Sequence, residues 1–115
     1  METPLAERHC RPLPRGTAPV GGPALDLLLG RLDAGWRVVS GPLLARRFAS
    51  PDYPRLVALA ARIGALAQAE DHHPDLALGY GALDVAVSTH SIGGLSENDF
   101  ILAAKIDLLA RETSF

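Results

Sequence analysis

Residues 83–90 read Leu83-Asp84-Val85-Ala86-Val87-Ser88-Thr89-His90, and apolar residues alternate with small or polar ones along this stretch. Successive side chains of a strand point to opposite faces, which separates an inner set (Leu83, Val85, Val87, Thr89) from an outer set (Asp84, Ala86, Ser88, His90). A period of two predicts a strand with one buried face. A second apolar run, residues 76–80, precedes it across Gly81-Ala82, so we expect a β-hairpin.

The segments on either side of this hairpin have the period of helices. Ser50-Pro51-Asp52 resembles a helix start, with a hydroxyl cap and Pro at the first helical position. This helix should run to about Ala69 and bury one face, formed by Leu56, Val57, Ala60, Ile63, Gly64 and Ala67. Ser96, with Asp99 three residues later, predicts the start of a last helix. Its buried face would hold Leu102, Ala103, Ile106, Leu109 and Ala110, and its wet face Lys105, Asp107 and Arg111.

The first half of the chain supplies one more helix and one more hairpin. A leucine stripe (Leu25, Leu28, Leu29, Leu32) predicts a helix that ends at Gly35. Trp36–Ser40 and Leu43–Phe48 are typical of short strands around the turn sequence Gly41-Pro42. The order is therefore α-β-β-α-β-β-α. We expect an α+β fold, a four-stranded antiparallel sheet with three helices packed on one face, because this arrangement buries all three apolar stripes.

The first 23 residues differ in composition from the rest. They hold five of the nine prolines, so we expect an irregular N-terminal arm over residues 1–23 and a single domain over residues 24–115. His9 and Cys10 lie in the arm, but two ligands are too few for zinc. Cys10 is the single cysteine and cannot form an internal disulfide, which is typical of a cytoplasmic protein.

Charge and hydropathy exclude several classes of function. The net charge of −2 gives no electrostatic basis for binding nucleic acid or an anionic membrane. No apolar run approaches the roughly 20 residues that span a bilayer, and residues 1–10 lack the apolar segment of a signal peptide. We therefore expect a cytoplasmic protein without nucleic-acid or membrane partners.

Three of the four histidines lie at element ends and are candidate functional residues. His72 and His73 follow the long helix, and His90 ends the alternating strand. Imidazole titrates near neutral pH, so two or three rings around one small molecule suit the addition or elimination of water. One ring would protonate the leaving hydroxyl while another takes a proton from the adjacent atom. Asp71 and Asp75 are close enough in sequence to fix a tautomer by hydrogen bonding.

Simpler roles for these histidines also stay open. A His-Pro sequence at a helix end can merely cap carbonyl groups through the imidazole. Three histidines could bind zinc, but adjacent residues do not converge on one ion by themselves, so no metal is expected. Asp99 is explained fully as a cap in the first turn of the last helix, and we assign it no catalytic role.

The chain carries Asp71-His72-His73-Pro74, then Tyr80, Ser88-Thr89-His90, Gly94-Leu95-Ser96-Glu97 and Asp99. In these residues and their spacing it resembles the pterin-4a-carbinolamine dehydratases over roughly residues 24–110. The resemblance implies the fold predicted above, homodimers or dimers of dimers, and dehydration of 4a-hydroxytetrahydropterin to quinonoid dihydropterin without a cofactor. It also implies that His72, His73 and His90 form the acid–base set. Asp71, Ser88, Thr89 and Ser91 would line the pterin site.

Three positions depart from the family pattern. Gln68 stands where the family usually carries an acid, one helical turn before His72, where a carboxylate could orient or charge that ring. Ser91 stands where an acid often follows His90, and Asn98 replaces an Arg that is usual in the first turn of the last helix. These are three losses of charge around one site.

The family also contains proteins with other roles, including a dimerisation partner of a homeodomain transcription factor and Rubisco assembly factors of carboxysome-forming bacteria. Two hypotheses follow. The chain is a hydro-lyase with His72 and His90 as its acid–base pair and His73 binding or assisting. Alternatively, it is a weak or inactive dehydratase-like chaperone or assembly factor for Rubisco or another protein client. We favour the enzyme because all three histidines are present.

Overall fold

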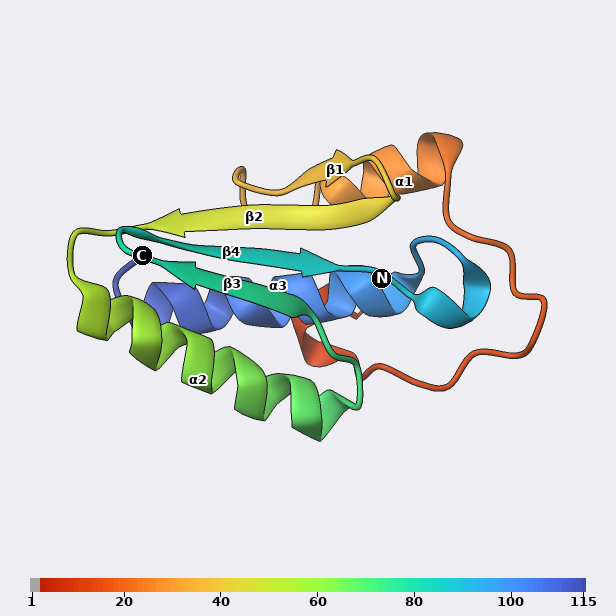
Figure 1. Ribbon diagram of the computed structural model, residues 1–115. Helices are drawn as coiled ribbons and strands as arrows, with labels where there is room; N and C mark the ends of the chain where they lie inside the picture. The colour runs from red at the N-terminus through yellow and green to blue at the C-terminus, as the bar shows by residue number, and fades with distance from the viewer. Residues whose placement is uncertain (1–2) are drawn as a thin grey trace.

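The computed structural model describes residues 3–115, and its main elements follow the predicted order (Figure 1). They are the 3-10 helix η1 (Leu5–Glu7), α1 (Gly22–Leu29), β1 (Arg37–Val39), β2 (Leu43–Ala49), α2 (Tyr53–Glu70), β3 (Asp75–Gly79), β4 (Ala82–Val87), the 3-10 turn η2 (His90–Ile92) and α3 (Glu97–Glu112). The strands form one antiparallel sheet in the order β1-β2-β4-β3. The predicted fold, with three helices and a four-stranded antiparallel sheet, is confirmed.

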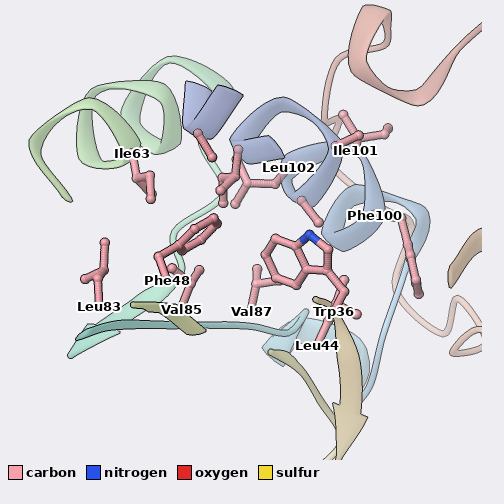
Figure 2. Packing of buried hydrophobic residues seen from close by; sticks show 14 of the residues in the cluster. Trp36, Leu44, Phe48, Ile63, Leu83, Val85, Val87, Phe100, Ile101 and Leu102 are labelled. Atoms are coloured by element: carbon pink, nitrogen blue, oxygen red, sulfur yellow. The ribbon is translucent and has the colours of Figure 1, made fainter. Parts of the chain in front are cut away.

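The alternation in β4 sets the register of the sheet. Leu83 pairs with Phe48 of β2 and Val87 pairs with Leu44, so the inner residues of both central strands face the helices. Leu83, Val85 and Val87 are at most 1% exposed. Figure 2 shows these side chains directed at residues of α2 and α3, among them Ile63 and Leu102.

Two expectations for α2 were wrong in detail. Asp52, not Ser50, caps the helix by accepting a hydrogen bond from the Arg55 amide at 3.2 Å. This start places Pro54 in the first turn, where its missing N–H is harmless. The buried face comprises Leu56, Leu59, Ile63 and Ala67, whereas Val57 is 42% exposed. The start of α1 lies at Gly22, and its end at Leu29 leaves Leu32 beyond the helix.

Asp107 was expected on the wet face of the last helix, and this was wrong. Asp107 is only 2% exposed. Its carboxylate accepts hydrogen bonds from the Trp36 indole at 2.7 Å, from Arg46 at 2.6 Å and from the Asp33 amide at 3.0 Å. Burial raises the pKa of Asp107 against the opposing effect of these donors. The Trp36 side chain lies beneath α3 in Figure 2, where this contact ties the loop before β1 to the helix.

The arm, residues 3–21 of the described chain, lies against the body of the protein. Its first part packs on α3, where Leu5 is 4% exposed and Lys105 donates to the Ala6 carbonyl at 3.0 Å. It then passes around the outside of the loop between β4 and α3 (Figure 1). There the Val20 amide donates to the Leu95 carbonyl at 2.8 Å. Across the described residues, no helix combines the length and apolarity that a membrane crossing needs.

Candidate active site

The end of α2 turns the adjacent histidines in different directions. Asp71 adopts the left-handed conformation at φ 51°. The His72 amide donates to the Ala67 carbonyl at 3.1 Å, and the Asp71 amide donates to the Gln68 carbonyl at 3.3 Å. Together these bonds form a Schellman turn, with Asp in the place that Gly usually takes. The chain thus leaves the helix with the His72 ring against α3 and with His73 exposed.

A buried carboxylate holds the His72 ring. His72 Nε2 lies 2.6 Å from Asp99 Oδ1, and the two side chains are 13% and 0% exposed. The other oxygen of Asp99 accepts hydrogen bonds from the Thr89 hydroxyl and from the Ser96 amide, both at 2.8 Å. The Thr89 and Ser96 hydroxyls lie 2.7 Å apart. Asp99 is therefore a cap, as predicted, but it also positions an imidazole, a role that the sequence did not reveal.

The contact with Asp99 selects one tautomer of His72. A carboxylate only accepts hydrogen bonds, so the Nε2 atom carries the proton that lies between the two groups. In a neutral imidazole the lone pair then lies on Nδ1. Because His72 lines a cavity, Nδ1 is the ring atom that could take a proton from a bound molecule.

Gln68 does not act on His72. Its Oε1 accepts a hydrogen bond from His73 Nε2 at 3.0 Å. The expectation that residue 68 orients His72 was therefore wrong, because α2 ends at Glu70 and helical spacing no longer applies to residue 72. Nor does the tautomer of His72 depend on Asp71 or Asp75, since Asp99 holds that ring.

His90 begins η2 at the outer end of β4 and is exposed to solvent. Its two chain neighbours, Thr89 and Ser91, both line the cavity, so the backbone of His90 passes the cavity's edge. The strand ends at Val87, two residues before its predicted end, so the predicted alternation is confirmed over β4 but His90 lies in a 3-10 turn and not on a strand face.

The cavity has a volume of about 220 Å³ and lies where the end of α2, the segment after β4, the start of α3 and the arm meet. Its described lining residues are Cys10, Arg11, Pro12, Leu13, Glu70, Asp71, His72, Thr89, Ser91 and Asn98. Of the predicted site residues, the structure thus brings together Asp71, His72, Thr89 and Ser91. Ser88, His73 and His90 are not among the described residues of the lining.

Glu70 anchors the arm at the rim of this cavity. Its side chain is 7% exposed and accepts hydrogen bonds from the Cys10 amide at 2.7 Å and from His9 Nδ1 at 2.8 Å. Burial acts to raise the pKa of Glu70, but these two donors and the charge of Lys105 outweigh it and lower that pKa. Burial and the neighbouring Glu70 raise the pKa of the Cys10 thiol to about 12, so this thiol stays protonated. In the described part of the chain, no group of three or more His, Cys, Asp or Glu side chains could hold a metal ion.

Residues 22–109 match the model of the family described as pterin 4 alpha carbinolamine dehydratase. A protein of Rickettsia bellii (strain OSU 85-389), provisionally named pterin-4-alpha-carbinolamine dehydratase, is 43% identical over 105 residues, 91% of this chain and 93% of its own. One of Nitrosomonas eutropha with the same name is 40% identical over 105 residues and covers 91% of this chain and 92% of its own.

Two solved structures have a similar fold. The crystal structure of a transcriptional coactivator/pterin dehydratase from Brucella melitensis matches with a TM-score of 0.74 and 30% identity, over 80% of this chain and 98% of that one. A pterin dehydratase-like protein identified as a RuBisCO assembly factor in the alpha-carboxysome matches with a TM-score of 0.58 and 25% identity, over 68% of this chain and 92% of that one.

Proposed function

The chain belongs to the pterin-4-alpha-carbinolamine dehydratase family, and from this premise we propose that it eliminates water from a 4a-hydroxytetrahydropterin to give a quinonoid dihydropterin. The observation that carries the proposal is the His72 ring, which is fixed by buried Asp99 and lines the cavity. The cavity combines apolar lining residues, such as Pro12 and Leu13, with a few polar ones, as small-molecule sites do.

In this proposal His72 is the general base. Its Nδ1 takes the proton from N5 of the pterin, and the charge that develops on the ring is stabilised by the Asp99 carboxylate 2.6 Å from Nε2. His90 supplies the proton that the 4a-hydroxyl needs to leave as water. The elimination thus removes one proton from nitrogen and delivers one to oxygen, with no change in the charge of the substrate. His73 is assigned an assisting role, and its Nε2 is held by Gln68.

The substrate-binding roles depend on whether each side chain is free to contact a ligand or is already hydrogen-bonded within the protein. Asp71 and Ser91 line the cavity and are exposed, which leaves their oxygens accessible to the polar edge of a pterin. The Thr89 hydroxyl is engaged with Asp99 and Ser96, so we assign it to the support of Asp99. Ser88 lies outside the described cavity lining and is assigned an indirect role.

The test is dehydration of freshly generated 4a-hydroxytetrahydropterin, followed by absorbance. The wild-type protein should exceed the spontaneous rate, and His72→Ala and His90→Ala should each lower kcat by about 10²-fold or more. Arg62→Ala is the control, because Arg62 is exposed on α2, pairs with Glu112 and lies outside the described cavity lining. A folded wild-type protein that is no faster than buffer would refute the proposal, whereas full activity of His90→Ala would remove only that residue's role.

A second candidate function is assembly of a protein client such as Rubisco. The similarity to the alpha-carboxysome assembly factor favours it, as does the amide of Gln68 where the family usually has an acid. The discriminating experiment is co-purification of the tagged chain with Rubisco subunits. Retention of folded subunits by a wild-type chain that has no dehydratase activity would support this candidate, and absence of retention would reject it.

We also propose a homodimer or a dimer of dimers, formed through the free edge of the sheet. β3 is an edge strand, and Leu76, Leu78 and Tyr80 at this edge are 36%, 39% and 94% exposed. Unpaired backbone groups and apolar side chains at an edge favour pairing with another strand. Light scattering after gel filtration should therefore give a mass above that of one chain, and Leu78→Lys should lower it. A monomeric wild-type protein would contradict this proposal.

A further inference from the structure

The arm closes one side of the cavity and is held there by buried side chains. The Asn98 side chain accepts from the Arg11 amide at 3.1 Å and donates to the Arg11 carbonyl at 2.7 Å. Asn98 is 6% exposed. The preceding amide, that of Cys10, donates to Glu70 at 2.7 Å. Residues 10 and 11 are therefore fixed to the end of α2 and to the start of α3 by side chains that have little access to water.

The last part of the arm, residues 19 and 20, packs closely against the loop that follows β4. A side chain at Gly94 would place its first carbon 2.8 Å from Pro19, which is closer than real contacts allow. The Gly94 carbonyl accepts a hydrogen bond from the Thr89 amide at 2.9 Å, so this loop also carries the cavity residue Thr89. The arm thus contacts the end of α2, the start of α3 and the loop after β4, which together surround the cavity.

The arm contributes residues 10–13 to the wall, and Arg11 is the cation among them. The Arg11 residue is exposed, and its guanidinium makes no hydrogen bond or ion pair within residues 3–115. Its backbone, by contrast, is held at both the amide and the carbonyl. The side chain therefore offers five donors from a fixed backbone position in the cavity wall, and such a guanidinium suits the carbonyl or hydroxyl acceptors of a planar ligand.

We propose that the arm is a wall of the substrate site and that Arg11 is a substrate-binding residue that donates hydrogen bonds to the bound pterin. This inference rests on the proposed function. It goes beyond the histidine chemistry because it assigns binding energy to a segment outside residues 22–109, the part that matches the family model. The match to the Rickettsia protein covers 105 residues, more than the 94 residues from 22 to 115, so it includes part of the arm.

The experiment measures the Kd of 7,8-dihydrobiopterin, which has no 4a-hydroxyl and cannot react, together with KM and kcat for dehydration. Arg11→Ala should raise Kd and KM by about tenfold, as expected for the loss of a hydrogen bond to a charged group, and should leave kcat within about twofold. Arg11→Lys should recover part of the affinity, since it keeps a charged donor. Arg15→Ala is the control, because Arg15 is an exposed arginine of the arm that lies outside the described lining.

The outcomes separate the two proposals. An active wild-type protein whose Kd and KM do not change in Arg11→Ala would overturn the assignment of Arg11 and leave the proposed function standing. An equal loss of affinity in Arg15→Ala would also overturn it, since a general effect of arm charge would then explain the result. A folded wild-type protein that neither dehydrates nor binds a pterin would overturn the proposed function, and the role of Arg11 with it.

Discussion

Replacing Asp99 with Asn tests whether the tautomer of His72 matters. The Asn carbonyl oxygen can accept the hydrogen bonds from Thr89 and from the Ser96 amide, both 2.8 Å long in the wild-type protein. The Asn amide group then faces His72 Nε2 and can only donate. His72 must accept at Nε2, which moves its proton to Nδ1 and removes the lone pair that the proposed base uses.

The expected magnitudes follow from these contacts. A hydrogen bond to a charged group contributes about 1 kcal/mol more than a neutral one. The free energy of unfolding of the variant should therefore be about 1–3 kcal/mol lower than that of the wild-type protein, while the helix cap is kept. The loss of a positioned base should lower kcat by about 10²–10⁴-fold. A 10²-fold loss corresponds to about 2.7 kcal/mol in the activation free energy. The effect on kcat therefore exceeds any that a small loss of folded protein could produce.

The assay combines kcat for pterin dehydration with the unfolding free energy from urea titration. Asp107→Asn is the matched control, because Asp107 is also a buried carboxylate of α3 with three hydrogen bonds but lies outside the cavity lining. It should lose comparable stability and keep kcat within about twofold. If Asp99→Asn is folded and retains at least a third of wild-type kcat, the reasoning from the tautomer is refuted.

Three further predictions follow from the environment of single residues. The folded-state pKa of Glu70 lies below its unfolded value, so its carboxylate stabilises the fold at neutral pH. This contribution is lost as the pH falls through the folded pKa. Glu70→Gln should therefore lower the unfolding free energy, measured by urea titration, more at pH 7 than in acid. Gln68→Glu would place a carboxylate beside His73 and should raise kcat if the missing acid limits turnover; an unchanged kcat, with Gln68→Ala equally harmless, would show that the position is irrelevant. With its pKa raised to about 12, Cys10 should be alkylated by iodoacetamide far more slowly at pH 8 than free cysteine, and equal rates would contradict its burial.

The parts of the fold that could be predicted depend on local signals. The alternation of residues 83–87 and the Ser96–Asp99 capping box each belong to one element, and both are confirmed. The start of α2 was misplaced because Ser50-Pro51 and Asp52-Tyr53-Pro54 give overlapping signals two residues apart. The phase of the α2 stripe was misjudged for a similar reason, since Val57 and Leu59 are both apolar and only packing against the sheet distinguishes them.

The candidate site was harder to predict because its contacts join distant parts of the chain. Asp107 was expected in water because it is charged, yet its partners Trp36 and Arg46 lie 71 and 61 residues away. Asp99 and His72 are 27 residues apart, and the arm contacts Asn98 across 87 residues. The histidines themselves were identifiable by their type and by the family motif. The hydrogen-bond partners of these histidines depend on which helix ends lie next to each other in the fold, and the periodicity of the sequence does not predict this.

The choice of Asp at residue 99 shows why helix rules alone could not assign its role. A capping box most often carries Glu or Gln at its third helical position, where the longer side chain reaches back to the cap amide. Asp99 meets the same requirement at 2.8 Å from the Ser96 amide, with one oxygen left for His72 at 2.6 Å. Because the side chain is 0% exposed, an extra methylene would have to displace the ring or the cap. The shorter acid thus satisfies the helix start and the imidazole together, which links the stability of α3 to the geometry of the proposed base.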